Sequence, residues 1–194
     1  MFQKEKFELY KEENELKLYI VNGYMSPVYY KNLMILALSL NEYNWVKEFI
    51  LNYKNELPED TRENIYMYCM ALYEFSMKEF ESSLELLSKI KYDELYLKYD
   101  SKVLQLMIYY ELKSEEPMIS SMEAFRHFLS NNKLLPDNKK DSYTNFYKFF
   151  NKIVNFNIKK DKIELENLKM KISGNITVLN KYWIIEKIDE IISK

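Results

Sequence analysis

Glycine and proline are scarce in this chain. Its 194 residues include two glycines, Gly23 and Gly174, and four prolines. All-β domains use many turns, which draw heavily on these two residue types. Nucleotide-binding α/β folds need glycine-rich loops around the phosphates. The shortage argues against both classes and favours a helical protein.

Cysteine and histidine are almost absent. Cys69 is the only cysteine, so the chain cannot form an internal disulfide, and His127 is the only histidine. These two residues cannot supply a zinc ligand set. Cys69 lies in an apolar helical segment, which predicts a buried, inert thiol. His127 recurs on the face of Tyr53 and Ile90, so we expect it to pack.

Arginine is rare, and positive charge comes almost entirely from lysine. Arg62 and Arg126 are the only arginines, and the formal net charge is −2. Arginine recognises phosphates and bases with paired hydrogen bonds, so its scarcity makes nucleic-acid binding a weaker expectation. A helical-repeat RNA-binding protein stays the alternative, because lysines near "FYKFF" could assemble into a basic stripe. These lysines are Lys139, Lys140, Lys148, Lys152, Lys159 and Lys160.

Targeting segments and catalytic motifs are also missing. No apolar run approaches the roughly 18 residues of a membrane span, and the charged start "MFQKEKFELYKEENELK" lacks the apolar run of a secretory signal. We therefore expect a cytoplasmic protein. No P-loop, Gly-x-Ser-x-Gly, His-Glu-x-x-His or EF-hand pattern occurs. The prediction is a non-catalytic protein without cofactor or metal.

Apolar residues recur at helical spacing along nearly the whole chain. In "WVKEFILNYKNEL", for example, Trp45, Phe49 and Tyr53 fall on one stripe. Prolines and short polar links divide the pattern into about ten helices within one domain, residues 1–194. The predicted elements are an N-terminal helix over 3–22, helix pairs over about 28–57, 59–91, 93–132 and 137–172, and a C-terminal capping helix over 177–192.

A spacing of 37 residues relates the first three pairs. It connects the ends of the first helices, the starts of the second helices, the small residues where two helices cross, and the core face beyond. The four sets are Leu38, Phe75 and Leu112; Tyr43, Phe80 and Pro117; Val46, Ser83 and Ser120; and Ile50, Leu87 and Ala124. Helix-pair repeats of this length belong to stacked solenoids, because one pair alone cannot bury its apolar faces.

The stretch "MYCMALYEFSMKEFESSLELLSKI", residues 67–90, resembles the tetratricopeptide (TPR-like) repeat family. Ala71 is the small residue of the first helix, and Phe80, Ser83 and Leu87 follow in the second. The resemblance covers residues 28–132 and, more loosely, 137–172. It implies an all-α fold, a right-handed α-solenoid of stacked antiparallel helix pairs. It also implies a concave groove lined by the first helices.

Mapped onto this chain, the implied groove holds eight candidate binding residues. They are Lys31, Ile35, Tyr68, Leu72, Phe75, Gln105, Tyr109 and Leu112. The family's lysine–asparagine clamp for a C-terminal carboxylate is not expected, although Lys31 and Asn32 have suitable types, because Ile35, Tyr68 and Leu72 are apolar or aromatic.

The predicted function is a protein–protein interaction scaffold that binds a partner peptide or helix in this groove. The sequence is also compatible with self-association through the C-terminal helix, by way of Trp183, Ile184 and Ile191.

Overall fold

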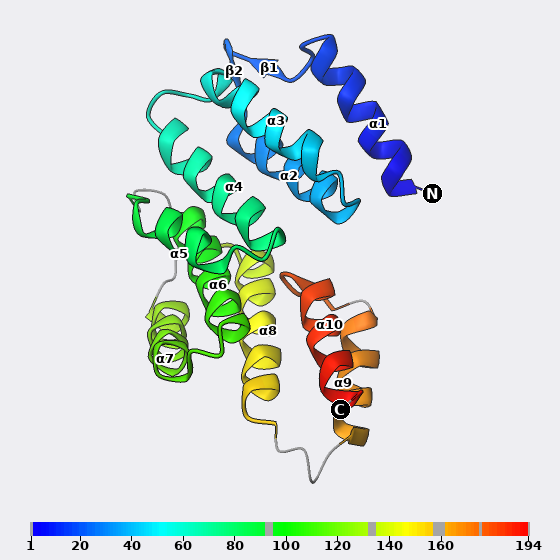
Figure 1. Cartoon of the computed structure of the whole chain (residues 1–194), viewed down its shortest axis with the longest axis vertical. Helices are drawn as coiled ribbons and strands as arrows, with labels where there is room; N and C mark the ends of the chain where they lie inside the picture. The colour runs from blue at the N-terminus through cyan, green and yellow to red at the C-terminus, as the bar shows by residue number, and fades with distance from the viewer. Residues whose placement is uncertain (1, 92–94, 132–134, 157–161, 175, 194) are drawn as a thin grey trace. The chain divides into compact units, whose positions relative to one another are not determined.

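The chain is almost entirely helical in a computed structural model that describes residues 2–91, 95–131, 135–156, 162–174 and 176–193 (Figure 1). Within these residues there are ten α-helices, one short 3-10 helix and one two-stranded hairpin. The all-α prediction is confirmed. None of the helices described is both long enough and apolar enough to cross a membrane.

Two compact units divide the chain, residues 1–112 and 113–194. In unit 1, α1 packs on α2, each of α2 and α3 packs on α4, and α4 also packs on α5 and α6. The elements of unit 1 are α1 (Phe2–Glu15), β1 (Ile20–Val21), β2 (Tyr24–Met25), α2 (Pro27–Ser39), α3 (Tyr43–Tyr53), the 3-10 helix η1 (Lys54–Glu56), α4 (Arg62–Ser76), α5 (Phe80–Ser88) and α6 (Leu95–Glu111).

Unit 2 contains α7 (Glu115–Asn131), α8 (Asp137–Val154), α9 (Lys162–Ser173) and α10 (Lys181–Ile192). Helix α8 packs on α7 and on α10, while α9 packs mainly on α10. The last helix therefore contacts both members of the predicted pair over 137–172. The predicted bounds at residues 93 and 132 lie outside the described residues.

The predicted helix over 3–22 is too long, because the chain turns after Glu15. Lys17 adopts a left-handed backbone with φ 53°, and a hairpin follows in which Ile20 pairs with Met25 and Val21 with Tyr24. Asn22 and Gly23 form its two-residue loop with φ 54° and 84°. Positive φ at both positions defines a type I′ turn, which Asn-Gly favours and which matches the twist of the strands.

Two helices of unit 1 end in the same turn, and this turn carries the 37-residue spacing. Asn41 and Lys78 both have positive φ, 62° and 66°. The next amide in each case bonds five residues back, from Glu42 to Ala37 at 3.1 Å and from Glu79 to Glu74 at 2.9 Å. This is the Schellman arrangement that satisfies the last helical carbonyls. The first two predicted pairs therefore share one local design.

The next left-handed turn residue, Lys113, comes 35 residues after Lys78, so the predicted spacing of 37 residues is two residues too long there. Lys113 has φ 55°, and the amide of Met118 bonds to Ser114 at 3.0 Å, as Ser83 does to Glu79. Met118 and Met122 are buried in α7, whereas Ser120 and Ala124, the residues that the 37-residue spacing predicts, are exposed.

The shift also explains why the prediction for His127 is wrong. Its side chain is exposed and lies 3.8 Å from Glu123. Phe125 and Leu129 occupy the buried face instead.

Ser83 marks the crossing of α4 and α5. It is fully buried, and its hydroxyl donates a 2.7 Å hydrogen bond to the carbonyl of Ala71 in α4. Small residues on both helices allow this close approach, and the hydrogen bond satisfies a hydroxyl that has no access to water. The small-residue positions predicted for this pair are therefore in contact.

Aromatic side chains fill the core between α1, α2 and α3. Trp45 meets the edge of Phe7 with ring centroids 4.9 Å apart and stacks on Phe49 at the same distance. Phe49 in turn contacts Tyr30 and Tyr53. Contacts of this kind add about 0.5–1.5 kcal/mol each beyond the burial of their area. They fix α1 to the first helix pair.

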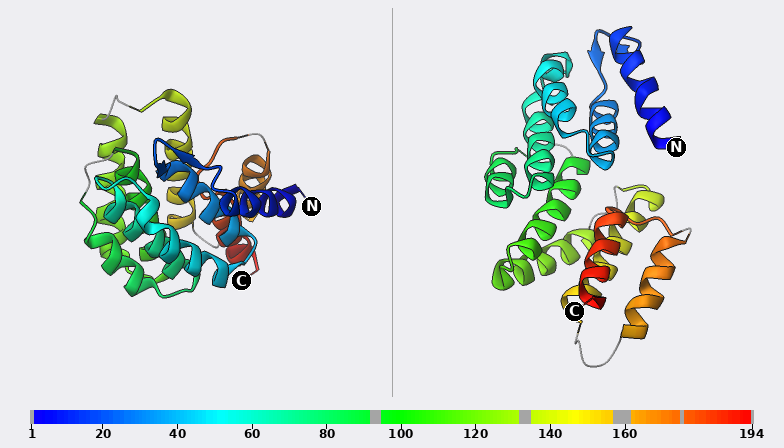
Figure 2. Two further views of the ribbon diagram at one scale, coloured as in Figure 1. Left: turned by 90° about the horizontal axis from the view of Figure 1, so that it is seen from above. Right: turned by 45° about the vertical axis from the view of Figure 1, so that its right-hand side comes forward.

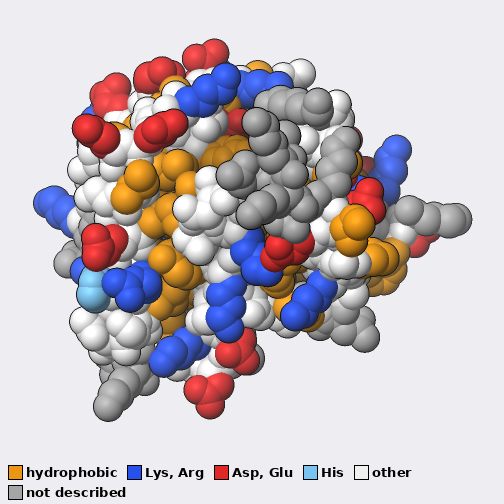
Figure 3. Space-filling view, turned by 90° about the horizontal axis from the view of Figure 1, so that it is seen from below, with side chains coloured by type: hydrophobic (Ala, Val, Ile, Leu, Met, Phe, Trp, Pro, Cys, Tyr) orange, Lys and Arg blue, Asp and Glu red, His pale blue; other side chains and the backbone are white. Residues whose placement is uncertain are grey.

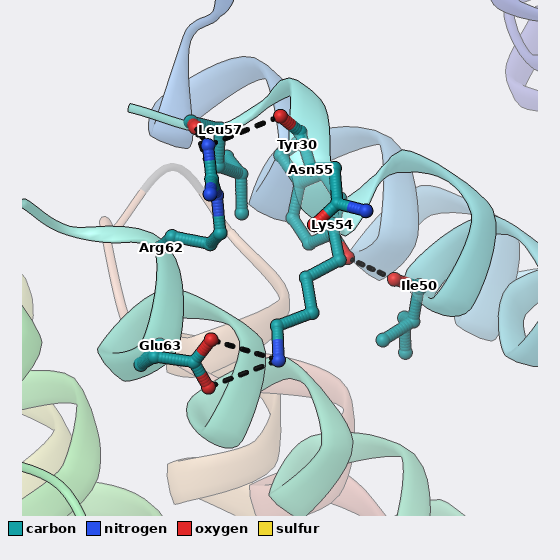
Figure 4. A network of polar contacts seen from close by, with 7 residues as sticks. All are labelled: Tyr30, Ile50, Lys54, Asn55, Leu57, Arg62 and Glu63. Atoms are coloured by element: carbon teal, nitrogen blue, oxygen red, sulfur yellow. Dashed lines mark hydrogen bonds and ion pairs between the residues drawn. The ribbon is translucent and has the colours of Figure 1, made fainter. Parts of the chain in front are cut away.

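Arg62 joins the end of α3 to the start of α4 (Figure 4). Its guanidinium donates to the carbonyls of Asn55 and Leu57 at 3.0–3.2 Å. Nearby, Lys54 pairs with Glu63 at 2.8 Å. One of the two arginines thus satisfies backbone carbonyls between helices, a task that suits its fixed fork of donors.

Candidate functional site

The candidate groove residues come from three helices that lie side by side in unit 1. Helix α4 packs between α2 and α6, so one face of the row is formed by all three (Figures 1 and 2). Ile35 on α2 is 47% exposed, and Tyr68 on α4 is 6% exposed. The other six candidates are half-buried: Lys31, Leu72, Phe75, Gln105, Tyr109 and Leu112.

Lys31 is occupied by an ion pair. Its Nζ lies 2.7 Å from Asp100 Oδ2 on α6, and both side chains are largely shielded from water. The same ammonium lies 5.5 Å from the ring centre of Tyr68, a cation–π distance. A carboxylate ligand would have to displace Asp100 from this lysine.

The contact between Lys31 and Asp100 also joins α2 to α6, the two outer helices of the row. Packed helices lie about 8–10 Å apart, so the outer two helices of a flat row of three are roughly twice as far apart. Side chains of α2 and α6 nevertheless meet over Tyr68 of α4. The long side chain of Lys31 therefore reaches across α4 and covers the ring of Tyr68 on the α2–α4–α6 face.

Beyond the ion pair, the candidate residues other than Gln105 are apolar or aromatic. On α4, Phe75 contacts Phe80 with ring centroids 5.5 Å apart. On α6, Gln105 donates a 3.2 Å hydrogen bond to the hydroxyl of Tyr109. One polar pair therefore borders a surface otherwise made of Ile35, Leu72 and ring faces.

The register of the third repeat changes which α6 residues correspond to those on α4. Counted from the left-handed turn residues Lys78 and Lys113, the positions equivalent to Tyr68, Leu72 and Phe75 are Val103, Met107 and Tyr110. Val103 and Met107 are buried, whereas Gln105 and Tyr109 are half-buried. The 37-residue spacing alone could not identify this difference.

Several tyrosines of unit 1 and Cys69 have pKa values raised toward the neutral form. Burial, followed by the neighbouring carboxylates Glu56 and Glu13, raises the pKa of Tyr19 and of Tyr29, whose hydroxyls bond to those carboxylates. Cys69 is buried, as predicted from the sequence, and its burial raises the pKa of the thiol to about 12. Nucleophiles and general bases need the opposite shift or a pKa near neutrality.

The pKa of Lys102 on α6 is also shifted. Partial burial, and then the charge of Lys98, lower its pKa. No three His, Cys, Asp or Glu side chains within the described ranges gather closely enough to hold a metal ion.

A hollow that the sequence did not predict lies in unit 2 between α7 and α8. Its volume is about 270 Å³, and its walls include Ile119, Met122, Tyr147 and Val154, with Arg126 beside them. Figure 3 shows a band of hydrophobic side chains bordered by charged ones on the face it views. The correct register of α7 would have placed Met122 beside this face, but the hollow itself depends on how α7 packs on α8.

The other surfaces named from the sequence are partly occupied. On α10, Ile184 is fully buried, and the half-buried Trp183 stacks on Phe150 with ring centroids 6.0 Å apart. Of the lysines considered for RNA binding, Lys152 pairs with Glu164 at 3.0 Å. Lys159 and Lys160 lie outside the described residues.

No family model, curated protein or solved structure matches the chain. The likeness to tetratricopeptide repeats therefore rests on the residues of this chain alone.

Proposed function

We propose that the chain is a non-catalytic scaffold protein that binds a segment of a partner protein along the α2–α4–α6 face. The proposal includes a TPR-like solenoid arrangement for its helix pairs. The observation that carries it is the mixed character of this face: Ile35 is nearly half exposed, and Leu72, Phe75, Tyr109 and Leu112 are half-buried around it.

The chemistry of such a face suits a peptide or helix with apolar side chains. Leu72 and Phe75 belong partly to the core, so they are held in place and lose little freedom when a ligand covers them. The ion pair of Lys31 with Asp100 offers hydrogen-bonding groups at one end of the face. An apolar helix with one polar end would complement this pattern.

Affinity capture from source-cell lysate tests the proposal with a matched pair of variants. Ile35→Glu places a charge on the face, whereas Leu51→Glu places one at a similarly exposed position, 51%, on α3. Both side chains reach water, so both variants should fold, and circular dichroism can check this. We expect a protein that is retained by the wild type and by Leu51→Glu but lost from Ile35→Glu.

Identical sets of retained proteins for all three would contradict the proposal for this face. Retention that depends on RNA and disappears after nuclease treatment would favour the RNA-binding alternative instead.

A further inference from the structure

The outer side of α1 carries a line of exposed apolar side chains. Phe2, Leu9 and Leu16 are 77%, 55% and 69% exposed. Leu16 continues the helical hydrogen bonding, because its amide donates to Glu12 at 3.0 Å. A step of seven residues returns to the same side of a helix with a drift of about 20°. The three side chains therefore form one stripe along α1.

The stripe faces away from the core of unit 1. Phe7 and Asn14, on the opposite side of the helix, are the buried residues of α1. Figures 1 and 2 show α1 at the edge of its unit, with α2 and α3 on one side. Three exposed apolar side chains aligned on one side of a surface helix can form the apolar part of an interface.

One edge of the stripe is acidic. Glu5, Glu8, Glu12 and Glu15 follow one another at steps of three and four residues, so they lie along one side of the helix, and all four are exposed. Glu8 pairs with Lys11 at 2.6 Å. The side chains of the other three make no ion pair or hydrogen bond within the part of the chain that the structure describes.

Two of these acids oppose the stability of α1. The C-terminal end of a helix carries partial negative charge, and glutamates there are unfavourable. Glu12 and Glu15 lie near that end, and the last turn holds no basic residue. Their neighbour Glu13 at least accepts a 3.4 Å hydrogen bond from Tyr29. The charges of Glu12 and Glu15 therefore do not stabilise the C-terminal end of α1 through the helix dipole.

We propose that the outer face of α1, defined by Phe2, Leu9, Leu16 and the acidic edge, is a docking surface for an amphipathic helix of a partner protein. The partner helix carries an apolar stripe bordered by lysines or arginines. Its apolar residues cover the stripe, and its basic residues meet Glu5, Glu12 and Glu15, as in the paired edges of two-helix interfaces. This surface is separate from the α2–α4–α6 face.

Other occupants fit the charges less well. Anionic lipid surfaces and nucleic acids would be repelled by the acidic edge. Two α1 helices paired antiparallel about a two-fold axis would place the acidic edges against each other. In a parallel pair of α1 helices, the acidic edge of one helix would face Lys6 and Glu13 of the other, and the charges of these two residues cancel. A basic helix is the occupant that neutralises the edge.

Synthetic peptides test this surface directly. One labelled peptide of roughly 18 residues, slightly longer than α1, carries leucines on one face and lysines beside them, and a second has glutamates in place of those lysines. Fluorescence anisotropy with the full chain should show binding of the lysine peptide only. Leu9→Ser should weaken that binding about tenfold, the value expected for one leucine lost from an interface.

The charge prediction uses a double variant, Glu12→Gln with Glu15→Gln. We expect several-fold weaker binding of the lysine peptide, while thermal unfolding shifts upward or stays unchanged because the helix dipole is relieved. Leu51→Ser and Glu48→Gln, exposed changes on α3, should leave binding at the wild-type level, and so should Ile35→Glu.

Binding of neither peptide, equal binding of both, or equal losses in the α3 controls would overturn the proposal. Loss of binding in the glutamine variant together with lower stability would also count against it, because the acids would then serve the fold.

Discussion

At the scale of residues, the buried side chain of Asn14 lowers the stability of unit 1. Asn14 is buried on α1, and neither Nδ2 nor Oδ1 of its side chain makes a hydrogen bond within the described residues. A buried carboxamide without partners costs about 1–3 kcal/mol. We predict that Asn14→Leu raises the free energy of unfolding by about 1–2 kcal/mol, as measured by urea denaturation. Asn32→Leu, an exposed change on α2, should have an effect within about 0.5 kcal/mol. A loss of stability in Asn14→Leu would contradict the burial of an unpaired amide.

Cys69 gives a prediction about pH and reactivity. Its pKa rises from 9.0 to about 12, chiefly through burial. The folded state therefore holds the thiol proton more tightly than the unfolded state. The stabilisation from this group is complete below pH 9 and is lost as the pH rises from 9 toward 12. At neutral pH, we expect iodoacetamide to modify Cys69 slowly in buffer and rapidly in urea. Rapid modification of the native protein would show that the thiol is accessible.

Several residues of the candidate site could be predicted from the sequence by type but not by environment. Tyr68 was expected to line the groove, yet it lies beneath the ammonium of Lys31 and is almost completely buried. The side chain of Lys31 covers Tyr68 because Lys31 pairs with Asp100 on α6, on the other side of α4. That contact joins residues 69 positions apart, and no local pattern predicts it.

At the scale of helices, the left-handed turns explain why the predicted 37-residue spacing holds for the first two helix pairs and fails for the third. The 37-residue spacing between the first two pairs follows from Asn41 and Lys78, which end their helices alike. The third turn, at Lys113, comes two residues early. Ser114 before Glu115 is a helix-start signal, and giving it more weight than Pro117 would have set the correct register. "VNGY" likewise holds the Asn-Gly signal of a hairpin, which an uninterrupted helical pattern concealed.

Lys78 itself provides a test of the turn. It is a non-glycine residue at φ 66°, where a Cβ costs roughly 1 kcal/mol or more. Lys78→Gly should therefore stabilise the protein by about 0.5–1 kcal/mol. Lys89, at the end of α5, has φ −86°, so Lys89→Gly should bring no gain and should cost some stability through backbone freedom. Equal effects of the two changes in thermal unfolding would contradict the role of the left-handed turn.

The crossing of α4 and α5 depends on one small residue. Ser83 is buried against Ala71, whereas its neighbour Ser82 is exposed. We predict that Ser83→Leu lowers the free energy of unfolding by about 1–3 kcal/mol, because a larger side chain must separate the helices. Ser82→Leu should change it by less than about 0.5 kcal/mol. If chemical denaturation gave similar values for both, the close crossing would not be a determinant of this helix pair.

For the whole molecule, composition predicted the helical class, because scarce glycine and continuous helical periodicity leave few alternatives. The number of helices was also predictable, since prolines and polar links separate them. The division into two units was not, because it depends on which helices pack together, as when α10 contacts both α8 and α9.

The most direct test of the proposed scaffold function is photocrosslinking in cells. A benzoylphenylalanine placed at position 35 reports on the α2–α4–α6 face, and the same residue at position 51 reports on a similarly exposed site of α3. We predict a discrete crosslinked protein adduct from position 35 and none from position 51. Adducts of equal yield and size from both positions, or none from position 35, would contradict binding of a partner along this face.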